Sequence, residues 1–167
     1  MENMPNNKMK SGQSVAEHDY FEQKREKARV IYDTQKNIRN PYLQTEVVFN
    51  SDGFHHLQFS ARSERGKKEQ LLKFSLLPLA INVIKKSGTL QEYRKDIVAV
   101  GKKGNDGFKK MKEVQYWGFT AIVGKQKIKI RVILRKIGDG NVIFWSVMPD
   151  SKLKGGQRLY SADIEDE

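Results

Sequence analysis

Two adjacent histidines, His55 and His56, are the residues of this sequence best suited to carry protons. Imidazole exchanges a proton near neutral pH more readily than other side chains do. Both histidines fall in a β-rich run, Phe54–Ser60, and neighbouring side chains on a strand point to opposite faces. We therefore expect His55 to share the apolar face of Leu57 and Phe59. His56 is expected on the polar face.

A cationic strand face is the second feature that points to chemistry. In the run 126–137 apolar residues alternate with basic ones, so one face of the predicted strand is apolar and the other carries Lys127, Lys129, Arg131 and Arg135. Arginine presents a planar fork of N–H donors that matches a phosphate. We expect Arg131, at the centre, to stabilise negative charge in a transition state. The other three are expected to hold the substrate backbone.

These residue types together suit the cleavage of RNA without a metal ion. That reaction needs one group to take the proton of the 2′-hydroxyl, one to protonate the 5′-oxygen, and fixed positive charge near the phosphorane. His56 or His55 can transfer a proton, Tyr116 can carry a second proton or stack on a base, and the lone hydroxyl of Ser146 can bind phosphate. Each also has a structural explanation as a packed, exposed or hydrogen-bonded side chain. Further substrate-binding residues are expected at Arg62, Lys68, Lys102 and Lys103.

Metal and cofactor sites are not indicated. The sequence has no cysteine, which excludes thiolate metal sites and thiol catalysis, and its central carboxylates are isolated from one another. The spacing of a P-loop is absent. Gly101 to Gly104 matches the GxxG loop of KH domains, but an apolar β-like run precedes it where a helix is required. We therefore expect neither a metal nor a cofactor.

Positive charge is concentrated in one third of the chain. The 167 residues carry 31 Lys and Arg against 20 Asp and Glu, and residues 101–160 hold 14 of the basic residues against 4 acidic ones. Such a surplus favours a polyanionic partner. RNA, including tRNA, is the expected partner, and an acidic antitoxin or immunity protein is a further one. No apolar run approaches the roughly 20 residues of a membrane span, so we expect no membrane partner and a cytoplasmic location.

Three helices are predicted to precede or flank the sheet that positions these groups. The first, Val15–Arg39, follows a capping box and ends before Pro41. The second, Lys67–Lys86, is apolar around most of its circumference, as buried helices are, and Pro78 is expected to kink or split it. A second capping box predicts a short helix over Thr89–Asp96.

The predicted strands form a hairpin and a meander. An Asp-Gly pair between Thr45–Asn50 and Phe54–Ser60 is a strong hairpin signal. After a basic loop, Val98–Lys112, three runs of strand composition are joined by glycine-containing turns: Glu113–Val123, Gln126–Ile137 and Asn141–Met148.

The order of these elements predicts an α+β fold. N-terminal helices precede an antiparallel sheet of four or more strands that ends in a three-stranded meander. Residues 14–150 form a single domain, to which the helix 15–39 is either integral or peripheral. Residues 1–13 are expected to be disordered, and residues 151–167 to form a flexible tail with an acidic end.

Five sequence blocks carry a family resemblance: GFHHLQFS (53–60), KKEQLLKFSLLPLAI (67–81), MKEVQYWGFTAIVG (111–124), IKIRVILRKIGDGN (128–141) and FWSVMP (144–149). They resemble the phage- and mobile-element-borne nucleases of the barnase–EndoU–colicin–RelE-like superfamily. The resemblance implies helices followed by a four-stranded antiparallel sheet, and metal-independent RNA cleavage with His56, Arg131 and Ser146 at the matching positions. The sheet shows no obvious glutamate base, so the general base stays unassigned.

Two functions follow as predictions. The first is a metal-independent endoribonuclease, a toxin or mobile-element effector that cleaves RNA by attack of the 2′-hydroxyl. The second is a non-catalytic nucleic-acid-binding module of a mobile element, which would use the same cationic strand face and the basic loop.

Overall fold

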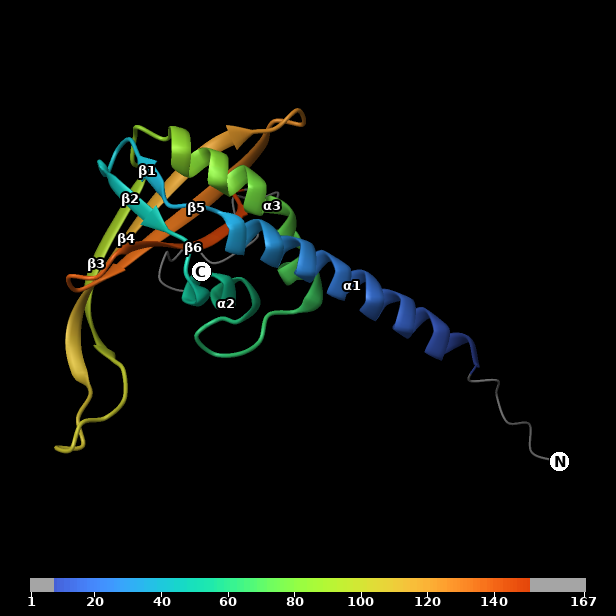
Figure 1. Ribbon diagram of the computed structural model, residues 1–167, viewed down its shortest axis with the longest axis horizontal. Helices are drawn as coiled ribbons and strands as arrows, with labels where there is room; N and C mark the ends of the chain where they lie inside the picture. The colour runs from blue at the N-terminus through green and yellow to red at the C-terminus, as the bar shows by residue number, and fades with distance from the viewer. Residues whose placement is uncertain (1–7, 151–167) are drawn as a thin grey trace, which may run out of the picture.

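The fold was analysed in a computed structural model that describes the backbone of residues 8–150 and the side chains of residues 14–150. The predicted flexible acidic tail at 151–167 and residues 1–7 of the predicted disordered N-terminus lie outside the described residues. For residues 8–13 the prediction of disorder is wrong, because their backbone is helical. Within residues 8–150, three helices accompany a six-stranded sheet (Figure 1). The helices are α1 (Lys8–Thr34), α2 (Ser51–Gln58) and α3 (Lys67–Lys86). The strands are β1 (Ile38–Asn40), β2 (Thr45–Val48), β3 (Glu92–Val100), β4 (Lys110–Val123), β5 (Ile128–Ile137) and β6 (Val142–Pro149).

The sheet has the strand order β1-β2-β6-β5-β4-β3. Strands β3 to β6 form an antiparallel meander, and β2 pairs with the start of β6 in parallel. The predicted α+β class and the predicted three-stranded meander are therefore confirmed. The sheet is larger than its predicted minimum because β3 extends the meander and because β1 and β2 add to its other side.

The predicted hairpin at the Asp-Gly pair is wrong, because Ser51–Gln58 forms α2. The side chain of Asn50 caps this helix by accepting a hydrogen bond from the Gly53 amide, and Phe54 and Leu57 are both buried at helical spacing. An added Cβ on Gly53 would meet the Phe144 carbonyl oxygen. The glycine thus serves close packing of α2 on β6 rather than a turn.

The predicted short helix over Thr89–Asp96 is also wrong. Residues from Glu92 onward form β3, which pairs with β4 over nine residues, from Glu92 opposite Gly118 to Val100 opposite Lys110. A capping box stabilises only one helical turn, whereas this pairing supplies a continuous ladder of backbone hydrogen bonds. The basic loop consequently begins after Val100 rather than at Val98.

The predicted bounds of the first helix are wrong at both ends, since α1 begins at Lys8 and ends at Thr34 rather than at Arg39. Asn40, in β1, is fully buried, donates to the Ile84 carbonyl and accepts from the Leu43 amide. These bonds hold the chain before Pro41 in a strand and a turn. By contrast, α3 has the predicted bounds, and Pro78 lies within it without dividing it.

The main core lies between α3 and one face of the sheet, and α1 packs on α3 (Figure 1). Trp117, Phe119 and Leu134 face this core. The other face of the sheet was predicted to present cations alone, and this prediction is wrong. It also carries a smaller apolar cluster, formed by Val114, Tyr116, Ile133 and Met148. None of the described helices is long and apolar enough to cross a membrane.

Candidate functional site

A cleft of about 410 Å³ lies where α2 and the segment after it meet β4, β5 and β6. Four of the residues singled out in the sequence line it together, namely His55, His56, Tyr116 and Arg135. The rest of its lining is Asp52, Phe59, Ser60, Ala61 and Trp145. The strand alternation that predicted opposite faces for the two histidines does not apply, because both lie on α2.

His56 is the buried histidine of the pair and is 6% exposed, so the prediction that it lies on an open polar face is wrong. Its ring stacks on that of Trp145, with ring centres 4.0 Å apart. The Arg65 guanidinium lies 3.3 Å from its Nε2 and also donates to its backbone carbonyl at 3.1 Å. A guanidinium can only donate, so Nε2 accepts and the neutral ring carries its proton on Nδ1.

His56 is held in its neutral form. Burial of the ring lowers its pKa from 6.5 to about 2, and the positive charges of Arg65, Lys73 and Arg135, together with His55, act in the same direction. With Nε2 already accepting from Arg65, the ring has no free lone pair with which to take a proton from a substrate. The geometry suits His56 to position Trp145 and Arg65.

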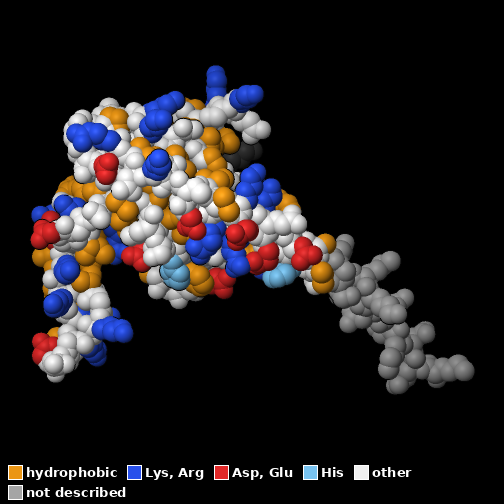
Figure 2. Space-filling model, viewed as in Figure 1, with side chains coloured by type: hydrophobic (Ala, Val, Ile, Leu, Met, Phe, Trp, Pro, Cys, Tyr) orange, Lys and Arg blue, Asp and Glu red, His pale blue; other side chains and the backbone are white. Residues whose placement is uncertain are grey.

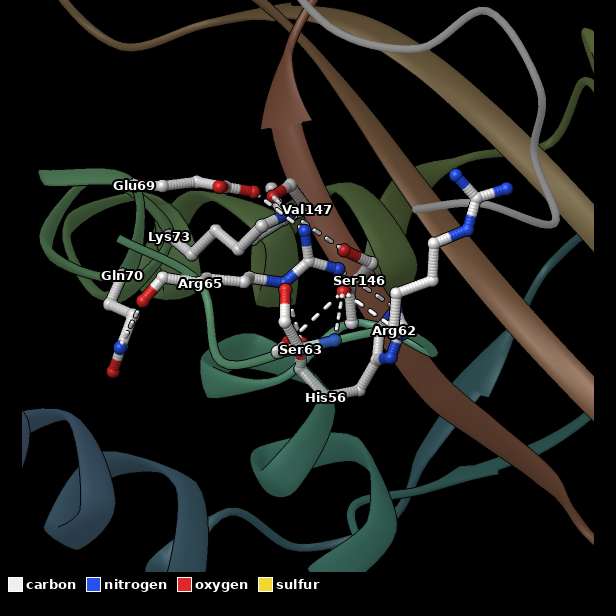
Figure 3. Close-up of polar contacts among 10 residues, drawn as sticks. His56, Arg62, Ser63, Arg65, Glu69, Gln70, Lys73, Ser146 and Val147 are labelled. Carbon is white, nitrogen blue, oxygen red and sulfur yellow. Dashed lines mark hydrogen bonds and ion pairs between the residues drawn. The ribbon is translucent and has the colours of Figure 1, made fainter. Parts of the chain in front are cut away.

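Two further cations, Arg65 and Lys73, lie near His56 without lining the cleft (Figure 3). Arg65 is buried and pairs with Glu69 at 2.6 Å, while Lys73 reaches from α3 to the edge of β6. The Lys73 ammonium is 1% exposed and donates to the Ser146 hydroxyl at 3.0 Å and to the Val147 carbonyl at 3.1 Å. Ser146 is therefore bound to Lys73 within the protein.

Arg135, Tyr116 and Trp145 form a cation–aromatic group in the cleft. The Arg135 guanidinium lies 4.1 Å from the centre of the Trp145 ring and 5.7 Å from that of Tyr116. Among the described residues, no hydrogen-bond acceptor meets Arg135 Nε or Trp145 Nε1, although both atoms are buried. A buried donor without an acceptor costs about 1–3 kcal/mol. Arg135 thus brings positive charge to the cleft, and two unsatisfied N–H groups belong to residues of its lining.

His55 is the exposed histidine, contrary to the prediction that it packs toward the core. Its ring stacks on Phe59, with ring centres 4.4 Å apart. Asp52, in the first turn of α2, is the acidic member of the lining. His55 therefore combines access to solvent with a fixed ring orientation, which are the properties expected of a proton-transfer group.

Arg131 does not reach the cleft. It is 2% exposed and pairs with Glu92 of β3 at 2.6 Å. It lies four residues from Arg135 along β5, roughly 13 Å at the rise of a strand. Burial and the ion pair indicate that Arg131 joins β5 to β3.

The predicted substrate-binding lysines are distributed over the molecule. Lys127 lies in the β4–β5 turn with a φ of 52°, and Lys129 pairs with Asp150 at 3.1 Å. Lys102 and Lys103 lie in the loop between β3 and β4. Lys68 lies on α3 beside a groove with α1. None of them lines the cleft. Arg62, on the segment between α2 and α3, does not line it either (Figure 3).

Besides the lining residues Phe59, Ser60 and Ala61, four charged or indole side chains in or near the cleft were not predicted to belong to the site: Asp52, Arg65, Lys73 and Trp145. Lys73 had a signal, because it falls on the buried face of α3 that includes Gln70 and Leu77. A lysine at such a position requires a polar partner. The other three had none, since they come together only when α2 forms as a helix.

Comparison with protein families, with curated proteins and with solved structures found no match to this chain. The chemistry of the cleft is therefore interpreted from its own geometry.

Proposed function

We propose that the protein is a metal-independent endoribonuclease that binds its substrate in the cleft between α2 and β6. The observation that carries this proposal is the convergence of an exposed histidine, unsatisfied N–H donors and the Arg135 guanidinium at one aromatic-lined cleft, with two buried cations near His56. Phosphate is the ligand class that matches such donors, and the rings of Trp145 and Tyr116 suit a base.

In the proposed reaction the 2′-oxygen of the substrate attacks the adjacent phosphorus, and the bond from phosphorus to the 5′-oxygen breaks. His55 takes the proton of the 2′-hydroxyl, and Tyr116, an O–H donor of the lining, gives a proton to the leaving 5′-oxygen. Arg135 stabilises the negative charge that develops on the phosphorane. Arg65 and Lys73 add positive potential near His56. The products are a 2′,3′-cyclic phosphate and a 5′-hydroxyl.

A non-catalytic nucleic-acid-binding module is the second candidate. The observation that favours it is the state of His56, whose Nε2 already accepts from Arg65, so that the lining offers one accessible imidazole instead of two. The same donors and rings would then bind a strand without cleaving it.

A cleavage assay in EDTA separates the two functions. The full chain would be incubated with total RNA that includes tRNA, beside His55→Ala, Arg135→Gln and the control His18→Ala, whose histidine is exposed on α1. If the protein is a ribonuclease, the products should carry 2′,3′-cyclic phosphate ends. The cleavage rate should fall by about 10²–10⁴ in His55→Ala, and His18→Ala should keep full activity. Wild-type protein that cleaves none of these RNAs refutes the ribonuclease. Salt-dependent RNA binding in that case supports the binding module.

A further inference from the structure

The hairpin of β3 and β4 extends beyond the rest of the sheet, and we call its residues 97–113 the arm. β5 pairs with β4 over Val114–Val123, so Lys110 to Glu113 pair with β3 alone. Figure 1 shows the arm projecting away from the helices at the lower left of the molecule. A projecting hairpin contributes little to the core, so its composition is free to serve binding.

The arm is strongly basic. Five exposed lysines lie on it, at Lys102, Lys103, Lys109, Lys110 and Lys112. Its two acidic residues both have partners: Glu113 pairs with Lys95 at 2.7 Å, and the Asp106 carboxylate accepts from the Phe108 amide within the arm. Figure 2 shows Lys and Arg side chains gathered along the arm. This density of positive charge indicates a polyanionic ligand.

The arm and the cleft share one face of β4. Alternation along the strand places Lys112 and Lys110 on the face of Tyr116, which lines the cleft, at roughly 13 and 20 Å from it. Arg94 of β3 and Arg135 of β5 are the residues paired with Tyr116 on either side. Arg94, Arg135 and Lys112 therefore share this face with Tyr116, and the row of Asp96, Val114 and Ile137 separates the cleft from Lys112.

The arm also presents an aromatic ring to solvent. Phe108 is 75% exposed, in the loop that carries the lysines. Exposed aromatic rings among cations are the usual means of binding single-stranded nucleic acid, since every base can stack on them. An acidic protein could bind the lysines, but arm lysines on the same face of β4 as the cleft, together with an exposed aromatic ring, favour one extended nucleic-acid strand.

We infer that the arm binds the backbone of RNA several nucleotides away from the phosphate held in the cleft. The preferred substrate is then a long or structured RNA, and dinucleotides engage the cleft alone. This inference rests on the proposed function, and it adds a second region of contact that sets the length of RNA recognised.

The test compares two triple variants of the full chain that lose equal charge. Lys102→Gln, Lys103→Gln and Lys109→Gln alter the arm. Lys85→Gln, Lys86→Gln and Lys125→Gln alter exposed lysines at the opposite end of β4, beside the turn into β5. Both variants change only exposed side chains, and circular dichroism would confirm that they fold.

Binding of a single-stranded RNA of ~20 nucleotides would be measured across a range of salt concentrations. The plot of log K against log salt has a negative slope. Loss of three phosphate contacts should make this slope shallower by about 2 in the arm variant, which corresponds to about 100-fold weaker binding at 0.1 M salt. The control variant should keep the wild-type slope. Cleavage of dinucleotides should be the same in all three proteins.

Equal RNA affinity and slope in the arm variant and in wild type would overturn the inference and would leave the arm as a surface for an acidic protein. Failure of the proposed function gives a different result. Wild-type protein would then cleave neither RNA nor dinucleotides, while the loss of binding in the arm variant would still establish the arm as an RNA contact.

Discussion

Protonation of His56 should destabilise the fold as the pH falls below neutrality. The ring is buried against Trp145, and its Nε2 accepts from Arg65. Burial is the largest cause of the lowering of its pKa to about 2, followed by Arg65, Lys73, Arg135 and His55. The carboxylate of Asp52 lines the same cleft without reversing the shift.

The size of this destabilisation follows from the difference between the pKa of His56 in the unfolded chain and its pKa in the folded protein. The pKa of the unfolded histidine is 6.5 and that of the folded one about 2, so the unfolded chain binds the proton first. Stability is therefore unaffected above pH 6.5 and is lost progressively as the pH falls from 6.5 toward 2. Each pH unit in this window costs about 1.4 kcal/mol, so the drop from pH 7 to pH 5 costs about 2 kcal/mol.

Urea unfolding at pH 7 and pH 5, followed by tryptophan fluorescence, measures this cost. His56→Gln keeps an acceptor for Arg65 but cannot be protonated in this range. The free energy of unfolding of wild type should fall by about 2 kcal/mol more than that of His56→Gln. His18→Gln, which changes an exposed histidine of α1, should behave as wild type. An equal fall in wild type and His56→Gln would refute the assignment of a buried, neutral ring.

Three substitutions, together with the control Gly66→Ala, test the packing that places α2 and β1. Gly53→Ala should destabilise by about 1–3 kcal/mol, because its Cβ would clash with a β6 carbonyl and the Tyr32 hydroxyl, whereas Gly66→Ala, with no atom within 4 Å of its Cβ, should have little effect. Asn40→Ala should cost about 1–3 kcal/mol, since a buried carbonyl and a buried amide lose their partner. Tyr32→Phe should cost about 1 kcal/mol through loss of its 2.7 Å bond to the Asn50 carbonyl. Urea midpoints measure all of these, and unchanged midpoints would contradict them.

The meander and α3 were predictable because their signals are local and repeated. The first half of β5 alternates apolar and basic residues, and α3 is rich in apolar residues from Leu71 to Ile84, so no neighbouring element had to be known. β3 and α2 were not predictable in the same way. The nine residues of β3 become a strand because β4 offers them a partner, and α2 forms because Asn50 and Gly53 fit it against β6.

The candidate site was predictable in its residue types more than in its geometry. His55, His56, Tyr116 and Arg135 were identified from sequence and do meet at the cleft, but the two histidines exchange their predicted environments because they lie on a helix. Arg131 fits the expected alternation on β5, but its guanidinium forms an ion pair with Glu92. Glu92 comes near Arg131 only because β3 pairs with β4 as a strand.

The hydrogen bond from Lys73 to the Val147 carbonyl has a consequence for self-association. β2 pairs with β6 only at Val142 and Ile143, so among the described strands the second half of β6 is an edge. Free edges are templates on which strands of other molecules add and aggregate. Lys73 occupies a carbonyl of this edge and α2 packs against the same strand, so an incoming strand meets a charged side chain and a helix. The lysine that brings positive charge to the cleft thereby also helps to keep the protein from polymerising through its sheet.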